Sequence, residues 1–314
     1  MKKIIRILSF LIPLSLLLSA CSTGQEQVQK KKDQLTIYTT VFPLQYFTSQ
    51  IGGKYVNVQT IYPPGADEHT FEPSQKDMMN LADSDLFFYI GLGLEGFVEK
   101  SKETLKNEHV KLVPTAEDID LPRLTDSHDE EEEDHHDTHE DVNPHVWLDP
   151  IYSKEMAAVI RDALNKQMPE HKEVFNANFQ KLALQLDELN TKYKQTIENA
   201  KHKKIIVTHA AFGYWEKRYG IEQISISGLS TANEPTQKEL EKIMSVAEHE
   251  GIHYMLFEQN VHSKLGKIVQ KEIGAKELPI HNLAILSKDN IKNKETYFSL
   301  MKQNLESLKT ALNE

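Results

Sequence analysis

The chain has 314 residues, of which 39% are hydrophobic and 26% charged, and this length is enough for two lobes that each bury a core. The formal net charge is −11, but the run at 126–141 holds ten carboxylates and no lysine or arginine, so the remainder is close to neutral. No basic stripe is left that could neutralise phosphates, and this excludes nucleic-acid binding.

The first twenty residues predict a signal peptide. Three basic residues precede an apolar stretch of about fifteen, which is too short to span a bilayer stably. The segment Leu18-Ser19-Ala20-Cys21 resembles a bacterial lipobox, which implies cleavage before Cys21 and membrane lipid attached to its sulfur. Cys21 is the only cysteine, so no intramolecular disulfide is expected. We expect residues 21–33 to form a lipid-anchored flexible tether and the protein to act outside the cytoplasm, at the bacterial cell membrane.

Beyond the tether, short β-rich runs alternate with helical patterns in two series. The expected strands lie at 35–41, 56–62, 85–90 and 109–113 in the first series, and at 204–208, 223–227, 253–258 and 276–283 in the second. This repetition predicts an α/β fold of two lobes, each with a mainly parallel sheet flanked by helices. We expect the N-terminal lobe at 34–170 and the C-terminal lobe at 201–314.

One long helix is predicted between the two series, at 171–200. Its apolar residues recur at steps of three and four and form one stripe on a charged rod: Phe175, Phe179, Leu182, Leu186, Leu189 and Tyr193. A rod of this kind would link the lobes and restrict how far they can hinge.

Local signals mark the ends of other helices. Asp149, directly before a proline, is predicted to be an N-cap, and Thr236 with Glu239 fits a capping box. Gly220 and Gly274 lie where helices are expected to end.

Three of the fourteen histidines lie where a ligand site is expected. In open α/β sheets, ligands bind beyond the carboxyl ends of the strands. His69 lies in a Pro- and Gly-rich loop after the predicted strand at 56–62, and His209 follows the strand at 204–208. His145 lies in the stiff segment NPHVWLDP before a predicted helix start. Imidazoles held on stiff turns suit Zn²⁺, but their spacing alone does not establish that they meet.

The other histidines in folded segments give weaker signals. Five lie at helix ends or strand starts among charged neighbours and read as ordinary surface residues: His109, His171, His202, His249 and His253. His262 and His281 lie after, or near the end of, strands of the second series, and both stay open as ligands.

The sequence resembles the substrate-binding lipoproteins of bacterial zinc ABC transporters, a group that also includes manganese-binding members. The resemblance covers the mature chain and rests on the lipobox, GADEHTFEPS, the acidic run, NPHVWLDP, and VTHAAFGYWEKRYGI followed by ISGLSTANEPT. It implies that His69, His145 and His209 bind the metal. It also implies capture of zinc and its delivery to the membrane permease of an ABC transporter. We expect the protein to be a monomer.

One position departs from the family pattern. Many relatives carry a glutamate, the fourth metal ligand, in a late segment that reads N-x-L-E-G-L, whereas here the segment is HNLAIL and the position is Ala284. Glu68, His281, Asp289 or a water molecule could fill the fourth position. The sequence favours Glu68 or water, because zinc tolerates an open fourth position.

The acidic run at 126–141 is predicted to be an insertion in the first lobe that keeps no single geometry. Its carboxylates would raise the local cation concentration, and its four histidines could chelate metal weakly: His128, His135, His136 and His139. The alternative is a solvated charge run without function. Our hypothesis is an accessory metal loop that collects ions and feeds the main site.

Other functions have to be weighed against zinc capture. A manganese-binding homologue is less favoured, because three nitrogens suit zinc whereas manganese prefers oxygen ligands. A zinc-dependent hydrolase would also use three histidines and an open position, but no nucleophile signature such as G-x-S-x-G is present. GLGLEG at 91–96 formally matches the dinucleotide-binding pattern without its strand context. We therefore expect no enzyme; an adhesin stays open for any lipid-anchored surface protein.

Overall fold

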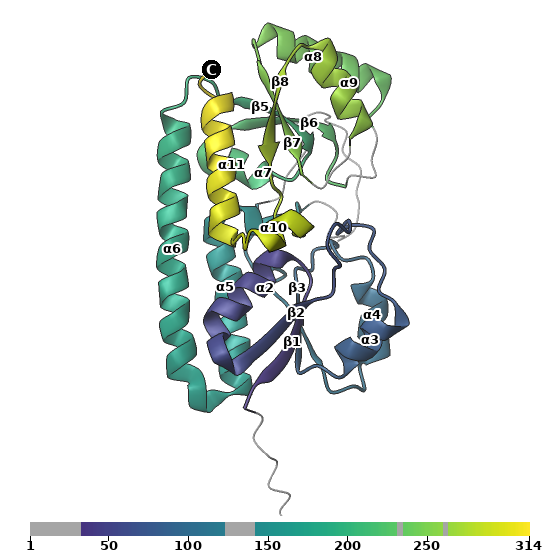
Figure 1. Cartoon of the computed structure of the whole chain (residues 1–314), viewed down its shortest axis with the longest axis vertical. Helices are drawn as coiled ribbons and strands as arrows, with labels where there is room; N and C mark the ends of the chain where they lie inside the picture. The colour runs from purple at the N-terminus through teal and green to yellow at the C-terminus, as the bar shows by residue number, and fades with distance from the viewer. Residues whose placement is uncertain (1–32, 123–141, 231–234, 260–262) are drawn as a thin grey trace, which may run out of the picture. The chain divides into compact units, whose positions relative to one another are not determined.

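The structure, a computed structural model, describes residues 33–122, 142–230, 235–259 and 263–314 (Figure 1). The predicted signal peptide at 1–20, Cys21 and the acidic run at 126–141 with its four histidines lie outside the described residues, as does His262. Residues 34–314 belong to one compact unit. None of the helices described is both long enough and apolar enough to cross a membrane.

The first lobe is built on four parallel strands in the order β2-β1-β3-β4. The strands are β1 (Leu35–Thr39), β2 (Val56–Thr60), β3 (Leu86–Tyr89) and β4 (Lys111–Pro114). Parallel neighbours need crossover connections, and these contain helices α2 (Phe42–Gly52), α3 (Gln75–Ala82) and α4 (Val98–Leu105). All residues of the inner strand β3 are buried, as expected for a parallel strand covered on both faces.

The second lobe repeats this arrangement with the strand order β6-β5-β7-β8. Its strands are β5 (Lys204–His209), β6 (Glu222–Ser227), β7 (Tyr254–Glu258) and β8 (Lys276–Ile280). The crossovers contain α7 (Gly213–Tyr219), α8 (Gln237–His249) and α9 (Lys264–Glu272). The expected α/β fold with two parallel sheets is therefore confirmed.

Two pairs of helices complete the structure: α5 (Pro150–Gln167) with α6 (Lys172–Glu198), and α10 (Lys288–Lys292) with α11 (Tyr297–Ala311). The 27-residue α6 packs against α5 and α2 near the first lobe and against α7 and α11 near the second (Figure 1). Its buried side chains include the whole apolar stripe expected from the sequence. The hydroxyl of Tyr193 also donates to the carbonyl of Met301 in α11 at 2.7 Å. A long helix thus connects the lobes, as predicted.

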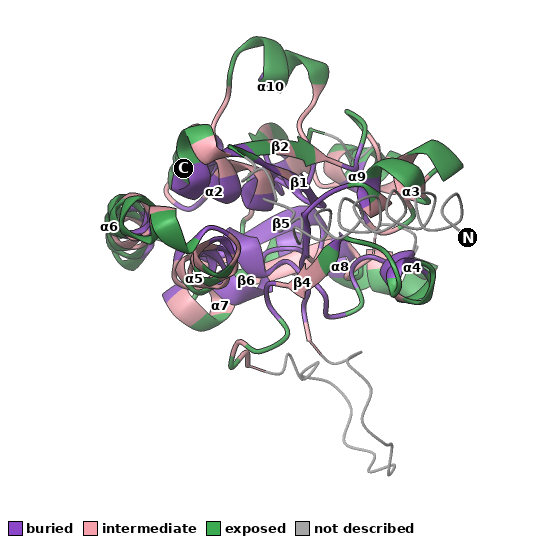
Figure 2. Ribbon diagram, turned by 90° about the horizontal axis from the view of Figure 1, so that it is seen from below, coloured by how far each residue is buried: buried purple, intermediate pink, exposed green. Residues whose placement is uncertain are grey.

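One large apolar core contains residues of both sheets and of the connecting helices, and a smaller core lies between the second sheet and helices α8 and α9. Figure 2, a view from below, shows buried residues in the middle of the molecule and exposed residues along the outer sides of the helices. Because the large core is shared, the two lobes are packed together where they meet.

The predicted helix ends are confirmed. Asp149 caps α5 by accepting from the backbone of Ile151 at 2.8 Å, and Thr236 and Glu239 form the capping box of α8. Gly220 has φ 75° directly after α7, a left-handed conformation that glycine adopts without strain. Gly274, with φ 66°, follows the end of α9.

The predicted strand at 276–283 is three residues too long, since β8 ends at Ile280. The backbone of His281 is held by Asn304 of α11, which accepts from its N–H at 2.8 Å and donates to its carbonyl at 2.7 Å. Leu283 then takes φ 62°, which lies outside the β region of the backbone. Side-chain contacts from a distant helix therefore end the strand.

Candidate metal centre

His69 lies in the loop between β2 and α3, and a local turn fixes its backbone. The carboxylate oxygen Oδ1 of Asp67 accepts from the N–H of His69 at 2.9 Å and from that of Thr70 at 3.1 Å. The Nε2 atom of His69 is buried, and no described residue forms a hydrogen bond with it. A buried polar atom without a partner is costly, and this suggests that it binds a ligand.

His145 lies directly before the short 3₁₀ helix η3 (Val146–Leu148) and is fully buried. Its Nδ1 atom is 2.7 Å from Oδ1 of Asn143, an oxygen that also accepts from the backbone N–H of His145 at 2.9 Å. Because a carboxamide oxygen only accepts, Nδ1 carries the proton. The lone pair of the neutral ring is therefore on Nε2.

His209 is the last residue of β5 and is also fully buried. Its Nδ1 atom is 2.7 Å from Oε1 of Glu258, the last residue of the neighbouring strand β7. The hydroxyl of Thr208 donates to the same oxygen at 3.0 Å. The carboxylate thus holds the proton of His209 on Nδ1, in the arrangement that supports metal-binding histidines.

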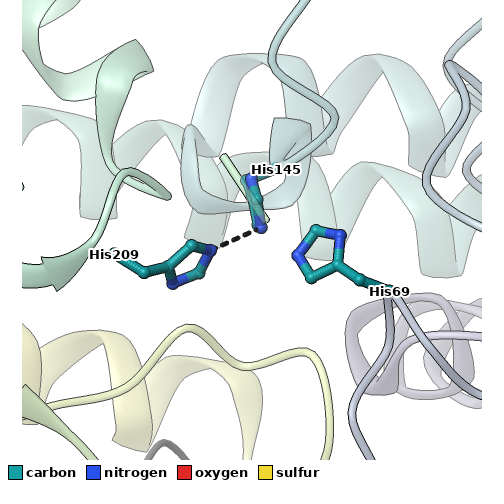
Figure 3. A group of neighbouring side chains, drawn as sticks. All are labelled: His69, His145 and His209. Carbon is teal, nitrogen blue, oxygen red and sulfur yellow. Dashed lines mark hydrogen bonds between the residues drawn. The ribbon is translucent and has the colours of Figure 1, made fainter. Parts of the chain in front are cut away.

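The three imidazoles meet between the two lobes (Figure 3). Each offers a nitrogen, and these three atoms lie within 4.8 Å of one another; no other cluster of this kind occurs in the described parts of the chain. Figure 3 shows the rings turned toward a common point. The Nε2 atoms of His145 and His209 lie 3.1 Å apart. Lone pairs that converge at this distance are stabilised by a cation.

The charge states of the three rings differ. Burial, and then the neighbouring His209, lower the pKa of His69 to about 4, and burial lowers the pKa of His145 well below its usual value. Burial alone would also lower the pKa of His209, but the charge and hydrogen bond of Glu258 outweigh it and raise that pKa. Two rings are therefore neutral near pH 7, as metal binding requires, and His209 is the ring that a proton occupies most readily.

Glu68 lies beside the cluster without joining it. Its side chain is buried, and Oε1 accepts from the amide nitrogen Nδ2 of Asn282 in the second lobe at 3.0 Å. Burial raises the pKa of Glu68 to about 7, although the charge of His209 acts in the opposite direction. A buried carboxylate with a raised pKa is stabilised in its charged form by a nearby cation.

The other candidates for the fourth position are placed differently. His281 has Nε2 3.2 Å from Oδ1 of Asn290, and its Nδ1 accepts from the N–H of Leu283 at 2.9 Å, so both ring nitrogens have partners. Asp289 is exposed on α10. Ala284 offers no side-chain ligand, and its carbonyl accepts from the N–H of Phe42 in the first lobe at 2.8 Å.

The segment HEGIH at 249–253 formally matches the H-E-x-x-H pattern of metalloproteases. That pattern requires both histidines on one face of a helix, but α8 ends at His249 and Gly251 has φ 63°. Neither histidine belongs to the metal-binding cluster among the described residues. The match is therefore a coincidence of sequence, and the hydrolase reading gains nothing from it.

Sequence patterns did not identify three polar groups around the cluster: Asn143 and Glu258, which bond to imidazoles, and Asn282, which donates to Glu68. Glu258 has a readable signal, because it ends an apolar strand at the same sheet edge as His209. Asn143 and Asn282 have none, because the NH₂ group of each donates to a residue in a distant segment, Ala210 and Glu68 respectively.

Residues 37–311 match the family described as zinc-uptake complex component A, periplasmic. The chain belongs to this family. The zinc-uptake component A family consists of solute-binding proteins rather than enzymes, which confirms the expectation from the sequence. The resemblance to zinc-transporter binding proteins is confirmed as well.

Two curated relatives of the zinc-uptake component A family are similar over most of the chain. Zinc-binding lipoprotein AdcA of Streptococcus pneumoniae (strain ATCC BAA-255 / R6) is 35% identical over 313 residues, which cover 98% of this chain and 61% of AdcA. High-affinity zinc uptake system protein ZnuA of Bacillus subtilis (strain 168) is 34% identical over 300 residues, covering 95% of this chain and 94% of ZnuA. The chain therefore spans about three fifths of the length of AdcA but nearly all of ZnuA.

A solved structure has the same fold. The Zn(II)-bound ZnuA-like domain of Streptococcus pneumoniae AdcA superposes with a TM-score of 0.75 at 31% sequence identity, covering 90% of this chain and 100% of that domain. This likeness extends to both lobes and agrees with membership of the zinc-uptake component A family.

Proposed function

We propose that the protein captures zinc outside the cytoplasm and delivers it to the membrane permease of an ABC transporter for import. The observation that carries this proposal is the convergence of three imidazole nitrogens between two lobes. In His145 and His209 the ring proton is held on Nδ1, which leaves Nε2 for the metal. Relatives named for zinc binding and zinc uptake support the choice of ion and of process. In this function zinc is cargo, so the site has to bind it tightly and later release it.

The proposed ligands are His69, His145 and His209, with Glu68 or a water molecule in the fourth position. Three nitrogen donors favour zinc over manganese, which prefers oxygen-rich sites. Glu68 is the carboxylate proposed to contribute, because it is buried beside the cluster and its hydrogen-bond partner Asn282 is neutral. Asn282 therefore does not balance the charge of the carboxylate. A manganese-binding function would instead require tighter binding of Mn²⁺ than of Zn²⁺.

The remaining parts of the proposal concern the ends of the transport route. Lipid on Cys21 would hold the protein at the outer surface of the cell membrane, next to the permease. The protein would act there as a monomer. The acidic run at 126–141, with His128, His135, His136 and His139, would act as an accessory loop that collects zinc for the main site.

Chelator competition tests the metal site directly. We expect one tight zinc per chain, and a loss of more than about 100-fold in affinity for His69→Ala, His145→Ala or His209→Ala, since even partners of ligands cost about 10–100-fold. His109→Ala is the matched control, because the side chain of this histidine is 70% exposed and does not belong to the cluster of three histidines. Tight zinc binding by the three variants would contradict the proposal.

Uptake tests the delivery step. Cells that lack this protein should regain growth in zinc-depleted medium when the full chain is supplied, and should not regain it with His145→Ala. The same rescue in cells that also lack the permease would contradict delivery through an ABC transporter.

A further inference from the structure

We propose that Asn143 is a positioning residue of the metal site, whose carboxamide fixes the proton of His145 on Nδ1 and ties His145 to the backbone that carries His209. This inference rests on the proposed function, because it assumes that both histidines bind zinc.

The orientation of the Asn143 carboxamide is determined by its surroundings. Nδ2 lies 3.2 Å from the carbonyl oxygen of Ala210 and 3.5 Å from that of Ala211, and a carbonyl can only accept. The NH₂ group must therefore face the two alanines, and Oδ1 must face His145. A flipped amide would place its oxygen against two carbonyls and its NH₂ group against the N–H of His145. Asn143 is fully buried, so water cannot relieve such a mismatch.

The fixed oxygen decides which nitrogen of His145 is available to a metal. With the proton held on Nδ1, the lone pair of Nε2 faces the point shared with His69 and His209. If the proton moved to Nε2, it would point at Nε2 of His209, 3.1 Å away, and would occupy the place of the ion. Asn143 thus keeps the ring in the tautomer that can bind metal.

The same side chain connects the two lobes at the site. Asn143 precedes His145 by two residues, whereas Ala210 and Ala211 directly follow His209. One carboxamide therefore sets the position of the first-lobe segment relative to the second-lobe segment. Glu258 supports His209 in a similar way, but both of these residues belong to the second sheet.

The side chain and the backbone carbonyl of Asn143 form hydrogen bonds with different residues, so one set of bonds can be removed as a control for the other. The hydroxyl of Tyr214 donates to the backbone carbonyl of Asn143 at 2.6 Å. Tyr214→Phe removes this bond from the same buried segment while it leaves the carboxamide and the imidazole untouched. Asn143→Asp keeps an acceptor for Nδ1–H and loses the donors to Ala210 and Ala211, whereas Asn143→Ala loses both.

The test compares these three variants of the full chain without zinc, using ¹H–¹⁵N correlation spectra of the histidine rings, and then measures zinc affinity by chelator competition. We expect Asn143→Ala to lose the Nδ1–H tautomer of His145 and about 10–100-fold in zinc affinity. Asn143→Asp should keep the tautomer and lose less affinity than Asn143→Ala. Tyr214→Phe should keep both the tautomer and the affinity, whatever its effect on thermal unfolding.

Two results would overturn the inference. One is an unchanged tautomer and affinity in Asn143→Ala; the other is an equal loss of affinity in Asn143→Ala and Tyr214→Phe. If Asn143→Ala does not fold, loss of the Nδ1–H tautomer in Asn143→Asp overturns it instead. The proposed function fails separately, since it predicts that His145→Ala loses tight zinc binding even where the Asn143 variants retain it.

Discussion

At the scale of single residues, the three imidazoles are chemically unequal although they meet at one point. His69 and His145 are kept neutral mainly by burial, whereas His209 is paired with the buried carboxylate of Glu258. If these rings bind zinc as proposed, the ion would compete with a proton at His209 far more than at the other two rings. This difference could not be read from the sequence, where all three are loop histidines.

Zinc affinity should depend on pH through one imidazole proton. The pKa of His209 is raised, so its neutral form is present above that pKa and is lost as the pH falls through it. The pKa of His69 is about 4, so this ring stays neutral over the same range. We expect the affinity for zinc to fall about tenfold per pH unit below the pKa of His209, or more steeply if Glu68 also binds. Chelator competition at several pH values measures this slope.

Glu258→Gln should shift the pH dependence of zinc affinity to lower pH. The amide would still accept from Nδ1 of His209, but without the negative charge burial would lower the pKa of the ring. The fall in affinity should then begin at a lower pH. Glu95→Gln is the control, because Glu95 is also buried, has a pKa raised by burial to about 7, and bonds to Thr40 rather than to an imidazole. An equal shift in both variants would argue against a specific role of Glu258.

The sequence predicted the three histidines but not the groups that hold them. His69 and His209 follow predicted strands, so the rule that ligands bind at the carboxyl ends of strands selected them. The bonds from Asn143 to Ala210 and from Asn282 to Glu68 join segments more than sixty residues apart in sequence. Such contacts depend on how the lobes pack, and no local pattern encodes them.

At the scale of elements, the start of α5 combines a helix cap with an ion pair between the lobes. Asp149 accepts from the backbone N–H groups of Ile151 and Tyr152, and its other oxygen pairs with the guanidinium of Arg218 in α7. The carboxylate is fully buried, whereas Arg218 keeps 26% of its side chain exposed. The cap fixes where α5 begins, and the ion pair fixes how α7 lies against it.

Asp149→Ala should destabilise the protein by about 2–3 kcal/mol, because it removes both the cap and the partner of a partly buried cation. Asp149→Asn should cost less, since its amide oxygen can still cap the helix. Thr236→Ala, which removes the exposed cap of α8, should cost about 1 kcal/mol. Denaturant unfolding measures all three. A loss in Asp149→Ala no larger than that in Thr236→Ala would mean that the ion pair contributes nothing.

Local and distant interactions explain which element boundaries the sequence could predict. The start of α5 and the start of α8 depend on side chains within three residues, and both were predicted correctly. The end of β8 depends on Asn304, more than twenty residues away, which holds the backbone of His281 outside the strand. No proline or glycine follows Ile280 to mark the end of the strand, so the predicted strand was too long.

At the scale of the whole molecule, the acidic run at 126–141 and the site between the lobes should act at different zinc concentrations. Deleting 126–141 should leave the affinity of the tight site unchanged, because none of its ligands is removed. It should slow uptake only when zinc is scarce, since the run would act by raising the local concentration of the cation. Growth of cells in media of graded zinc content measures this. An equal loss of growth at every zinc level would contradict the role of the run as a collector.

The helix α6 has a consequence for how the ion leaves. Its buried stripe packs against helices beside both sheets. Swinging the second lobe widely away from α6 would therefore expose apolar side chains such as Tyr193, which contacts Trp215 and Tyr219 of α7, to water. This cost opposes a wide hinge opening of the two lobes. Under the proposed function, zinc would instead leave through small displacements of the loops that carry His69 and His145, and a membrane permease would have to impose them.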